Sequence, residues 1–216
     1  MPRIACLHTI ASNVAVFDAA LQETGLTGLT LHHHVRADLL TAAEREGRLT
    51  PAIAAETAAL LRDLAAEADA VLLTCSTLGP AAEDAASDAA VPVLRVDAAL
   101  AAEAVRQGGR VVVLCAVETT VEPTRRLFEA AARATGAEIA VEVVPRAWEA
   151  FKAGDADRYR ALVARAADAA RAGGAAQVAL AQASMAGAAG LLPPESRPLT
   201  SPTVGLAAAI AASRAG

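Results

Sequence analysis

Short apolar runs alternate along this chain with longer, alanine-rich stretches in which charged residues recur. Runs such as residues 70–73 (AVLL) and 110–116 (RVVVLCA) have no polar face, which is typical of strands buried on both sides. We predict strands at residues 3–9, 29–35, 70–73, 91–97, 110–116, 137–144, 177–181 and at Pro198-Leu199. Strands that alternate with helices predict an α/β fold with parallel sheets covered on both faces.

The stretches between these strands carry the start and stop signals of helices. Thr50-Pro51 and either Asp155 or Asp157 are N-cap candidates for two long helices, and the segment that begins at Leu39-Leu40 is predicted as a connection. A helix is predicted from the loop around Ser12-Asn13 to about residue 24, and further helices at residues 51–66, 81–90, 98–107, 122–135, 155–172 and 205–213.

The pattern repeats itself once. From Arg3 to Arg110 the offset is 107 residues, and the same offset carries Gly47 onto Gly154 and Cys75 onto Gln182. We therefore expect two pseudo-symmetric, doubly wound parallel-sheet (Rossmann-like) domains with the active site in the cleft between them. The boundaries are residues 1–97 and 98–202, with the C-terminal helix, 203–216, joined to the first domain. Ligands bind at the carboxyl ends of strands in such sheets, so Cys75 and Gln182 are expected to face one cleft.

Composition narrows the class of protein. The chain has 216 residues, of which 55% are hydrophobic and only 2% aromatic, so its core must consist of Ala, Val, Leu and Ile. A net charge of −5 with interspersed signs argues against nucleic acid or an anionic membrane as a partner. Strand-like sequence by Arg3 leaves no room for a signal peptide, and three cysteines then indicate reduced thiols in the cytoplasm.

One cysteine differs from the others. Cys6 and Cys115 lie inside apolar runs and are interpreted as core residues, whereas Cys75 follows a buried strand and precedes Ser76, Thr77 and a helix start at Gly79-Pro80. The positive end of a helix dipole favours a thiolate, and its N–H groups bind carboxylates. Cys75 is therefore the candidate reactive residue.

Other residues admit a functional and a structural interpretation. His32 and His34 share one strand face and lack further ligands, so a polar strand end near the cleft is favoured over a metal site. His8 either supports Cys75 or the substrate, or is a structural histidine. Thr9, Ser12 and Asn13 lie in the loop where such sheets meet ligands, or serve the loop itself. No glycine-rich phosphate loop is present, so we expect no nucleotide cofactor. Because the histidines lack further ligands, we expect no metal either.

The chain resembles the aspartate/glutamate/hydantoin racemase superfamily of cofactor-independent enzymes. The resemblance rests on Thr74-Cys75-Ser76-Thr77, on the segment Leu180-Ala181-Gln182-Ala183-Ser184-Met185, and in part on Thr119-Thr120. It implies two pseudo-symmetric α/β domains, each contributing a catalytic cysteine on either side of a small carboxylate. The site residues expected are catalytic Cys75 and substrate-binding Ser76, Thr77, Thr119, Thr120, Gln182, Ala183 and Ser184. Thr9 and Asn13 are added as substrate-binding residues because of their place in the loop after the first strand.

One departure from the family pattern decides the expected reaction. Gln182 stands where the second catalytic cysteine is expected, and an amide is neither a base nor a nucleophile at neutral pH. Two-base racemisation is then replaced by one-sided chemistry at or next to the α-carbon, such as decarboxylation or cis–trans isomerisation. A binding protein for small carboxylates and a scaffold protein are the alternatives from other classes, and a homodimer stays open.

Overall fold

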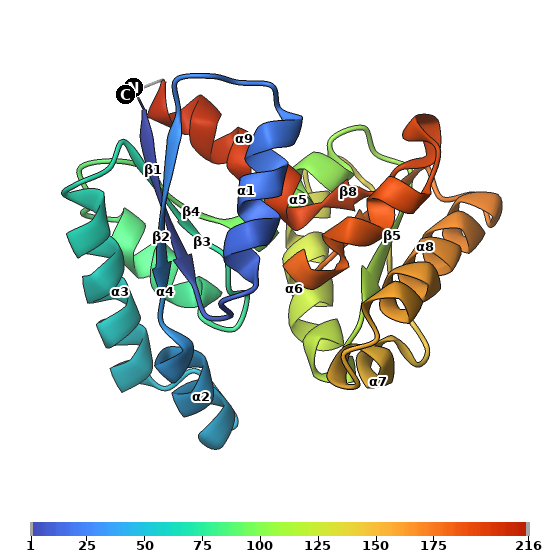
Figure 1. The fold of residues 1–216 in the computed structure, drawn as a ribbon, viewed down its shortest axis with the longest axis horizontal. Helices are drawn as coiled ribbons and strands as arrows, with labels where there is room; N and C mark the ends of the chain where they lie inside the picture. Colours follow the sequence, from blue (N-terminus) through green and yellow to red (C-terminus); the bar gives the residue numbers. More distant parts are fainter. Residues whose placement is uncertain (1, 215–216) are drawn as a thin grey trace. The chain divides into compact units, whose positions relative to one another are not determined.

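The computed structural model describes residues 2–214, in which two four-stranded sheets are built from parallel pairs only (Figure 1). The strand order is β2-β1-β3-β4 in the first sheet and β6-β5-β7-β8 in the second. The strands are β1 Arg3–His8, β2 Thr30–Val35, β3 Ala70–Leu73, β4 Val93–Arg95, β5 Arg110–Cys115, β6 Glu138–Val143, β7 Gln177–Leu180 and β8 Leu199–Thr200.

Helices follow the strands in the order that the sequence predicts. The α-helices are α1 Asn13–Glu23, α2 Ala37–Arg45, α3 Pro51–Ala65, α4 Gly79–Ala86, α5 Val96–Val105, α6 Val121–Ala132, α7 Ala147–Lys152, α8 Ala156–Ala172 and α9 Ser201–Ser213. The described part of the chain also contains the 3₁₀ helices η1 Glu118–Thr120, η2 Ala183–Leu191 and η3 Pro194–Ser196. Among residues 2–214, no helix has both the length and the apolar run that crossing a membrane requires.

The predicted caps hold the two long helices. The Thr50 hydroxyl accepts a hydrogen bond from the backbone N–H of Ile53 at 3.4 Å, and the Asp155 carboxylate accepts one from Arg158 N–H at 3.1 Å. Each cap satisfies one of the N–H groups that a helix start leaves without an intrahelical acceptor. Asp155, and not Asp157, is therefore the cap of α8.

The chain divides into two compact units. One comprises the chain up to Ala99 together with the chain from Pro202 onward, and the other comprises Leu100–Ser201. Each unit contains one of the sheets, with its own buried core.

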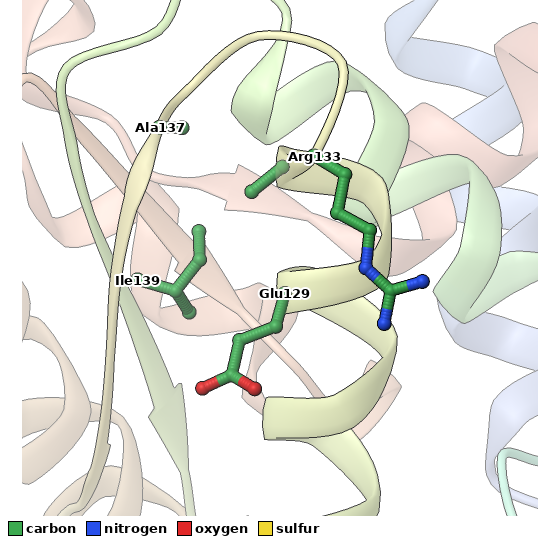
Figure 2. Close-up of a pocket in the computed structure, with 5 residues that line it drawn as sticks. Glu129, Arg133, Ala137 and Ile139 are labelled. Carbon is green, nitrogen blue, oxygen red and sulfur yellow. The ribbon is translucent and has the colours of Figure 1, made fainter.

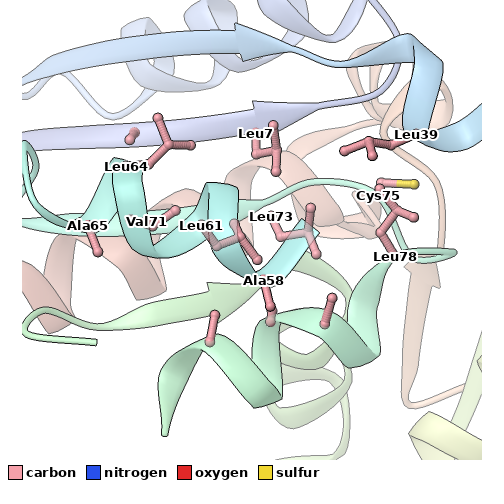
Figure 3. Close-up of a cluster of buried hydrophobic side chains, with 14 of the residues drawn as sticks. Leu7, Leu39, Ala58, Leu61, Leu64, Ala65, Val71, Leu73, Cys75 and Leu78 are labelled. Carbon is pink, nitrogen blue, oxygen red and sulfur yellow. The ribbon is translucent and has the colours of Figure 1, made fainter. Parts of the chain in front are cut away.

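In the first unit, one face of the sheet packs against α2, α3 and α4. Leu7, Val71 and Leu73 point from the strands into this layer and meet Leu61 from α3 and Leu78 from the turn before α4 (Figure 3). α1 covers the opposite face, where the rings of His8 and Phe17 lie 5.3 Å apart.

In the second unit, the equivalent face packs against α7, α8 and η2. Leu114 and Leu180 meet Val163 from α8 and Met185 from η2, all of them buried. The apolar runs that the sequence shows are therefore strands with both faces covered, as a parallel sheet requires.

The register confirms the internal repeat at its centre. Leu7 pairs with Leu73 in the first sheet, and Leu114 pairs with Leu180 in the second, so both partners shift by 107 residues. Gly47 and Gly154, related by the same offset, both adopt positive φ, of 66° and 72°, which glycine tolerates without strain. At the edge strand the offset changes, since Arg3 pairs with Thr30 but Arg110 with Glu138.

Two local expectations are corrected. The segment at Leu39-Leu40 is helix α2, because Leu39 and Ala43, one helical turn apart, both bury their side chains in the first core. α5 and α9 also begin earlier than expected, at Val96 and Ser201, directly after the short strands β4 and β8.

Candidate active site

Cys75 lies two residues beyond the end of β3, one of the two central strands of the first sheet. Its side chain is buried, with 9% exposure, at the end of the first core next to Leu39 and Leu78 (Figure 3). The three-residue turn Ser76-Thr77-Leu78 separates it from the start of α4. The thiol therefore has an apolar side and a side that adjoins the first turn of a helix.

Hydroxyl and amide groups adjoin Cys75 at the same edge of the sheet. Thr9 follows β1 as Cys75 follows β3, because Leu7 and Leu73 are paired. Thr9 and Asn13 are buried, whereas Ser76 and Thr77 are exposed. Within residues 2–214, the backbone N–H groups of Ser76 and Thr77 have no acceptor, so they are available to an anion.

Thr74, the residue before Cys75, is tied to the sheet on its other face. Its N–H and its hydroxyl both donate to the carbonyl oxygen of Leu7, at 3.0 and 3.1 Å, and its Oγ1 lies 2.8 Å from Nδ1 of His8. His8 has no exposed surface, which supports its structural interpretation.

His8 belongs to a line of polar side chains that the sequence did not reveal. Its Nε2 lies 2.8 Å from Nδ1 of His33, and Nε2 of His33 lies 3.1 Å from Oδ1 of Asp18. Burial and the neighbouring His33 lower the pKa of His8 to about 4, so its imidazole is neutral at neutral pH. His32 and His34 are exposed on the opposite side of β2. In the sequence, the one sign of this group was strand alternation, which places His33 on the opposite face of the strand from His32 and His34.

Gln182 occupies in the second unit the position that Cys75 occupies in the first. It lies two residues beyond β7, and its Oε1 accepts a hydrogen bond of 2.6 Å from the backbone N–H of Ala116, which follows the adjacent strand β5. Because the carbonyl end of the amide is used, its NH₂ end supplies two donors.

The other predicted residues of the second unit lie at the same edge of its sheet. Ala183 and Ser184 begin η2 directly after Gln182, and the Ser184 hydroxyl is 3.0 Å from the hydroxyl of Tyr159. Thr119 and Thr120 lie in η1 after β5, where the Thr120 hydroxyl donates to the carbonyl oxygen of Val117 at 2.7 Å. The structure thus gathers the candidates within each unit. That both groups serve one site stays a prediction.

The two remaining thiols are core residues. Cys6 and Cys115 have no exposed surface, and burial raises the pKa of each, to about 12 for Cys6. Both thiols are therefore protonated at neutral pH in the protein alone.

Arg95 is a partly buried cation near the Cys75 turn that sequence reasoning missed. It ends β4, its side chain is 13% exposed, and it bonds Asp97 through two nitrogens at 3.0 and 2.9 Å and Glu83 at 2.5 Å. The guanidinium lies against Gly79, the first residue of α4, where a Cβ would come within 2.5 Å of it. Since two carboxylates already neutralise it, we assign Arg95 to anchoring α4 to β4.

A surface pocket of about 230 Å³ lies between α6 and β6 of the second unit (Figure 2). It is lined by Glu129, Ala132, Arg133, Ala137 and Ile139. Ala137 and Ile139 mark the beginning of β6, so the pocket adjoins the amino-terminal edge of the sheet. It contains none of the candidate residues.

The model of the Asp/Glu/Hydantoin racemase family matches residues 8–211. The chain belongs to this family. A comparison with curated protein sequences finds no match.

Solved structures of racemases and an isomerase have the same fold. An aspartate racemase homologue from Pyrococcus horikoshii is 15% identical with a TM-score of 0.70, covering 99% of this chain and 100% of its own. Allantoin racemase from Pseudomonas fluorescens is 17% identical with a TM-score of 0.68, covering 99% and 92%. Maleate isomerase from Pseudomonas putida, solved with maleate, is 14% identical with a TM-score of 0.63, covering 96% and 90%. Identities this low establish the shared racemase-family fold alone.

Proposed function

We propose that this racemase-family protein is a cofactor-independent enzyme that acts at or next to the α-carbon of a small carboxylate. Cys75, as the thiolate, is its base or nucleophile, and no second thiol takes part. Membership of the family supports the substrate class, and racemases and a maleate isomerase share the fold.

The observation that carries the proposal is the hydrogen bond between Gln182 and Ala116. It holds the amide with its carbonyl oxygen on the backbone and its NH₂ group free to donate. An oriented NH₂ group binds a carboxylate but cannot remove or return a proton at carbon. Gln182 therefore serves to bind the substrate. A two-thiol racemase would need an acid or base at this position.

Further hydrogen-bond donors for the substrate come from the residues that follow β3 in the first unit and β5 and β7 in the second. Ser76 and Thr77 offer backbone N–H groups, and the first N–H groups of η2, on Ala183 and Ser184, lack intrahelical acceptors. The Thr119 hydroxyl is exposed, whereas the Thr120 hydroxyl hydrogen is already donated to Val117. Such donors stabilise both a bound carboxylate and an enolate formed beside it.

With one thiol, two reactions balance. In cis–trans isomerisation, the Cys75 sulfur adds to one alkene carbon, the electron pair moves into the carboxylate, the carbon–carbon bond rotates, and expulsion of the thiolate restores the double bond. In decarboxylation, the bond to the departing carboxylate breaks, CO₂ leaves, and the electron pair forms an enediolate. For this reaction Cys75 acts as the protonated thiol: it protonates that carbon from one face, and water then reprotonates the thiolate.

Incubation in D₂O distinguishes these reactions from racemisation. Aspartate, glutamate, substituted hydantoins, maleate and a disubstituted malonate are followed by NMR and chiral chromatography. We expect turnover of maleate or the malonate, or deuterium exchange in a single enantiomer, and a loss of at least a thousand-fold in Cys75→Ser. Cys115→Ser, which removes a buried thiol outside the candidate site, is the matched control.

Two outcomes contradict the proposal. Rapid interconversion of both enantiomers, each with α-deuterium, would reveal a second base and overturn the assignment of Gln182. Tight dicarboxylate binding without any turnover or exchange would make the protein a carboxylate-binding protein. A crystal structure with a bound dicarboxylate would test whether Cys75 and Gln182 contact the same molecule.

A further inference from the structure

A second group of reactive side chains lies on the face of the first sheet that α1 covers. Cys6 and His8 are two residues apart on β1 and so share a face, and the register pairs Cys6 with His33 on β2. One ligand atom from each, the Cys6 sulfur and a nitrogen of each histidine, lies within 4.8 Å of the other two. Cys6 and His8 are fully buried, and the His33 side chain is 14% exposed.

Hydrogen bonds hold the outer nitrogen of each ring and leave the inner nitrogens facing each other. The Thr74 hydroxyl lies 3.1 Å from the carbonyl oxygen of Leu7 and 2.8 Å from Nδ1 of His8, and when its hydrogen is given to Leu7 it accepts from Nδ1–H of His8. The Asp18 carboxylate can only accept, so Nε2 of His33 carries the hydrogen that it receives. With His8 protonated on Nδ1, both inner nitrogens, Nε2 of His8 and Nδ1 of His33, carry lone pairs that can bind a metal ion.

These two inner nitrogens lie 2.8 Å apart, with the Cys6 sulfur close by. Without a metal ion, a hydrogen bond from Nε2–H of His8 to Nδ1 of His33 satisfies this contact, and the Thr74 hydroxyl then donates to Nδ1 of His8. A metal ion takes the place of that shared proton when His8 carries its hydrogen on Nδ1. The third ligand atom is a soft sulfur, which a shared proton does not need but which zinc prefers.

We propose that Cys6, His8 and His33 form a zinc-binding site between the first sheet and α1, with Asp18 and Thr74 orienting the two histidines. The arrangement matches the carboxylate–histidine–zinc pattern, in which the ring nitrogen away from the metal donates to a carboxylate or another oxygen. Tetrahedral zinc with Zn–N bonds of about 2.0–2.1 Å needs ligand nitrogens about 3.3 Å apart. The two nitrogens, now 2.8 Å apart, would have to move apart only slightly to reach that distance. Water supplies the fourth ligand.

This site is distinct from the candidate active site. The zinc ligands face α1, whereas Cys75 belongs to the core on the opposite face, and the two are linked through Thr74. The proposal departs from the sequence-based expectation of no metal, which considered His32 and His34 and not the residue between them. It does not depend on the proposed reaction.

Zinc binding is measured on the full chain after removal of metals with a chelator. Equilibrium dialysis with zinc sulfate, followed by elemental analysis, is expected to give one zinc per chain. His33→Gln should weaken the affinity at least a hundred-fold, and Asp18→Asn ten- to a hundred-fold. His34→Gln is the matched control, because it removes an exposed histidine from the same strand and should leave the affinity unchanged.

Cobalt(II) identifies the sulfur ligand. Substitution with cobalt should produce a near-ultraviolet thiolate-to-metal absorption band that Cys75→Ser and Cys115→Ser retain and Cys6→Ser loses. If Cys6→Ser does not fold, retention of the band by the other two cysteine variants assigns it to Cys6. Failure to bind zinc at micromolar concentrations, or equal loss of binding in His34→Gln, would overturn the proposal. The first result would leave a shared proton between His8 and His33, and the second would indicate chelation by the exposed histidines.

Discussion

At the scale of single residues, the three thiols differ in surroundings although all three are buried. Cys6 and Cys115 have 0% exposure within strands, whereas Cys75 has 9% exposure at a strand end beside a helix start. Burial raises the pKa of the Cys115 thiol, and a thiol is unreactive while it keeps its proton. The position along a strand therefore separates a core cysteine from a candidate nucleophile.

Iodoacetamide labelling of the native protein should follow this order. Cys75 is expected to be modified at least ten-fold faster than Cys115 at neutral pH, and Cys115 labelling should rise only at alkaline pH, because its raised pKa delays formation of the thiolate. Mass spectrometry of peptides after timed quenching measures each site. Faster labelling of Cys115 than of Cys75 at neutral pH would remove the reason for assigning Cys75 as the reactive residue.

Gln182 shows how residue chemistry and position combine. Its place in the repeat was readable from the sequence, because the 107-residue offset carries Cys75 onto it. Its orientation was not, because the bond to Ala116 joins two strand ends whose pairing depends on the sheet order. The sequence thus shows that Gln182 stands where the family has its second base. The structure adds that its amide is oriented by the bond to Ala116, with the NH₂ group as a donor.

At the scale of elements, Gly205 allows helix α9 to lie close to Val96. A Cβ on Gly205 in α9 would lie 2.4 Å from Cγ2 and 3.2 Å from Cα of Val96, the first residue of α5. Val96 is β-branched and stiff, so the backbones themselves would have to separate. Gly205 therefore sets how closely α9 approaches Val96.

Gly205→Ala should destabilise the protein in spite of the better helix propensity of alanine. Overpacking costs about 1–3 kcal/mol and outweighs a gain of about 1 kcal/mol from replacing glycine inside a helix. Gly190→Ala is the control, because no atom lies within 4 Å of the added Cβ and the residue has ordinary φ. Urea unfolding should give a lower midpoint for Gly205→Ala alone. An unchanged or higher midpoint would contradict the packing argument.

Hydrophobic patterning predicts most elements, and its failures have physical causes. β3, the cap Thr50 and the choice of Asp155 or Asp157 as the other cap were predicted because apolar runs and capping residues act locally. α2 was missed because its nine residues bury only Leu39 and Ala43, too few to show a helical period. The Cys6–His8–His33 group was missed because alternation shows which residues share a face, but not which face a helix covers.

At the scale of the whole molecule, the two units differ in how the chain builds them. The second unit is one continuous segment, Leu100–Ser201, whereas the first needs both the chain up to Ala99 and the chain from Pro202 onward. Leu206 and Ala209 of α9 are fully buried, and α9 contacts Val96 of the same unit. The first unit is therefore incomplete until the last helix has been made.

Fragments should show this difference. A fragment of residues 100–201 contains a complete four-stranded sheet with its own core, and it should unfold cooperatively. A fragment of residues 1–99 lacks α9 and should be less ordered, because the apolar residues that pack against that helix become exposed. Joining residues 202–216 to it through a flexible linker should restore cooperative thermal unfolding, measured by circular dichroism. If residues 1–99 unfold with the same midpoint and cooperativity with and without this helix, α9 does not complete the first unit.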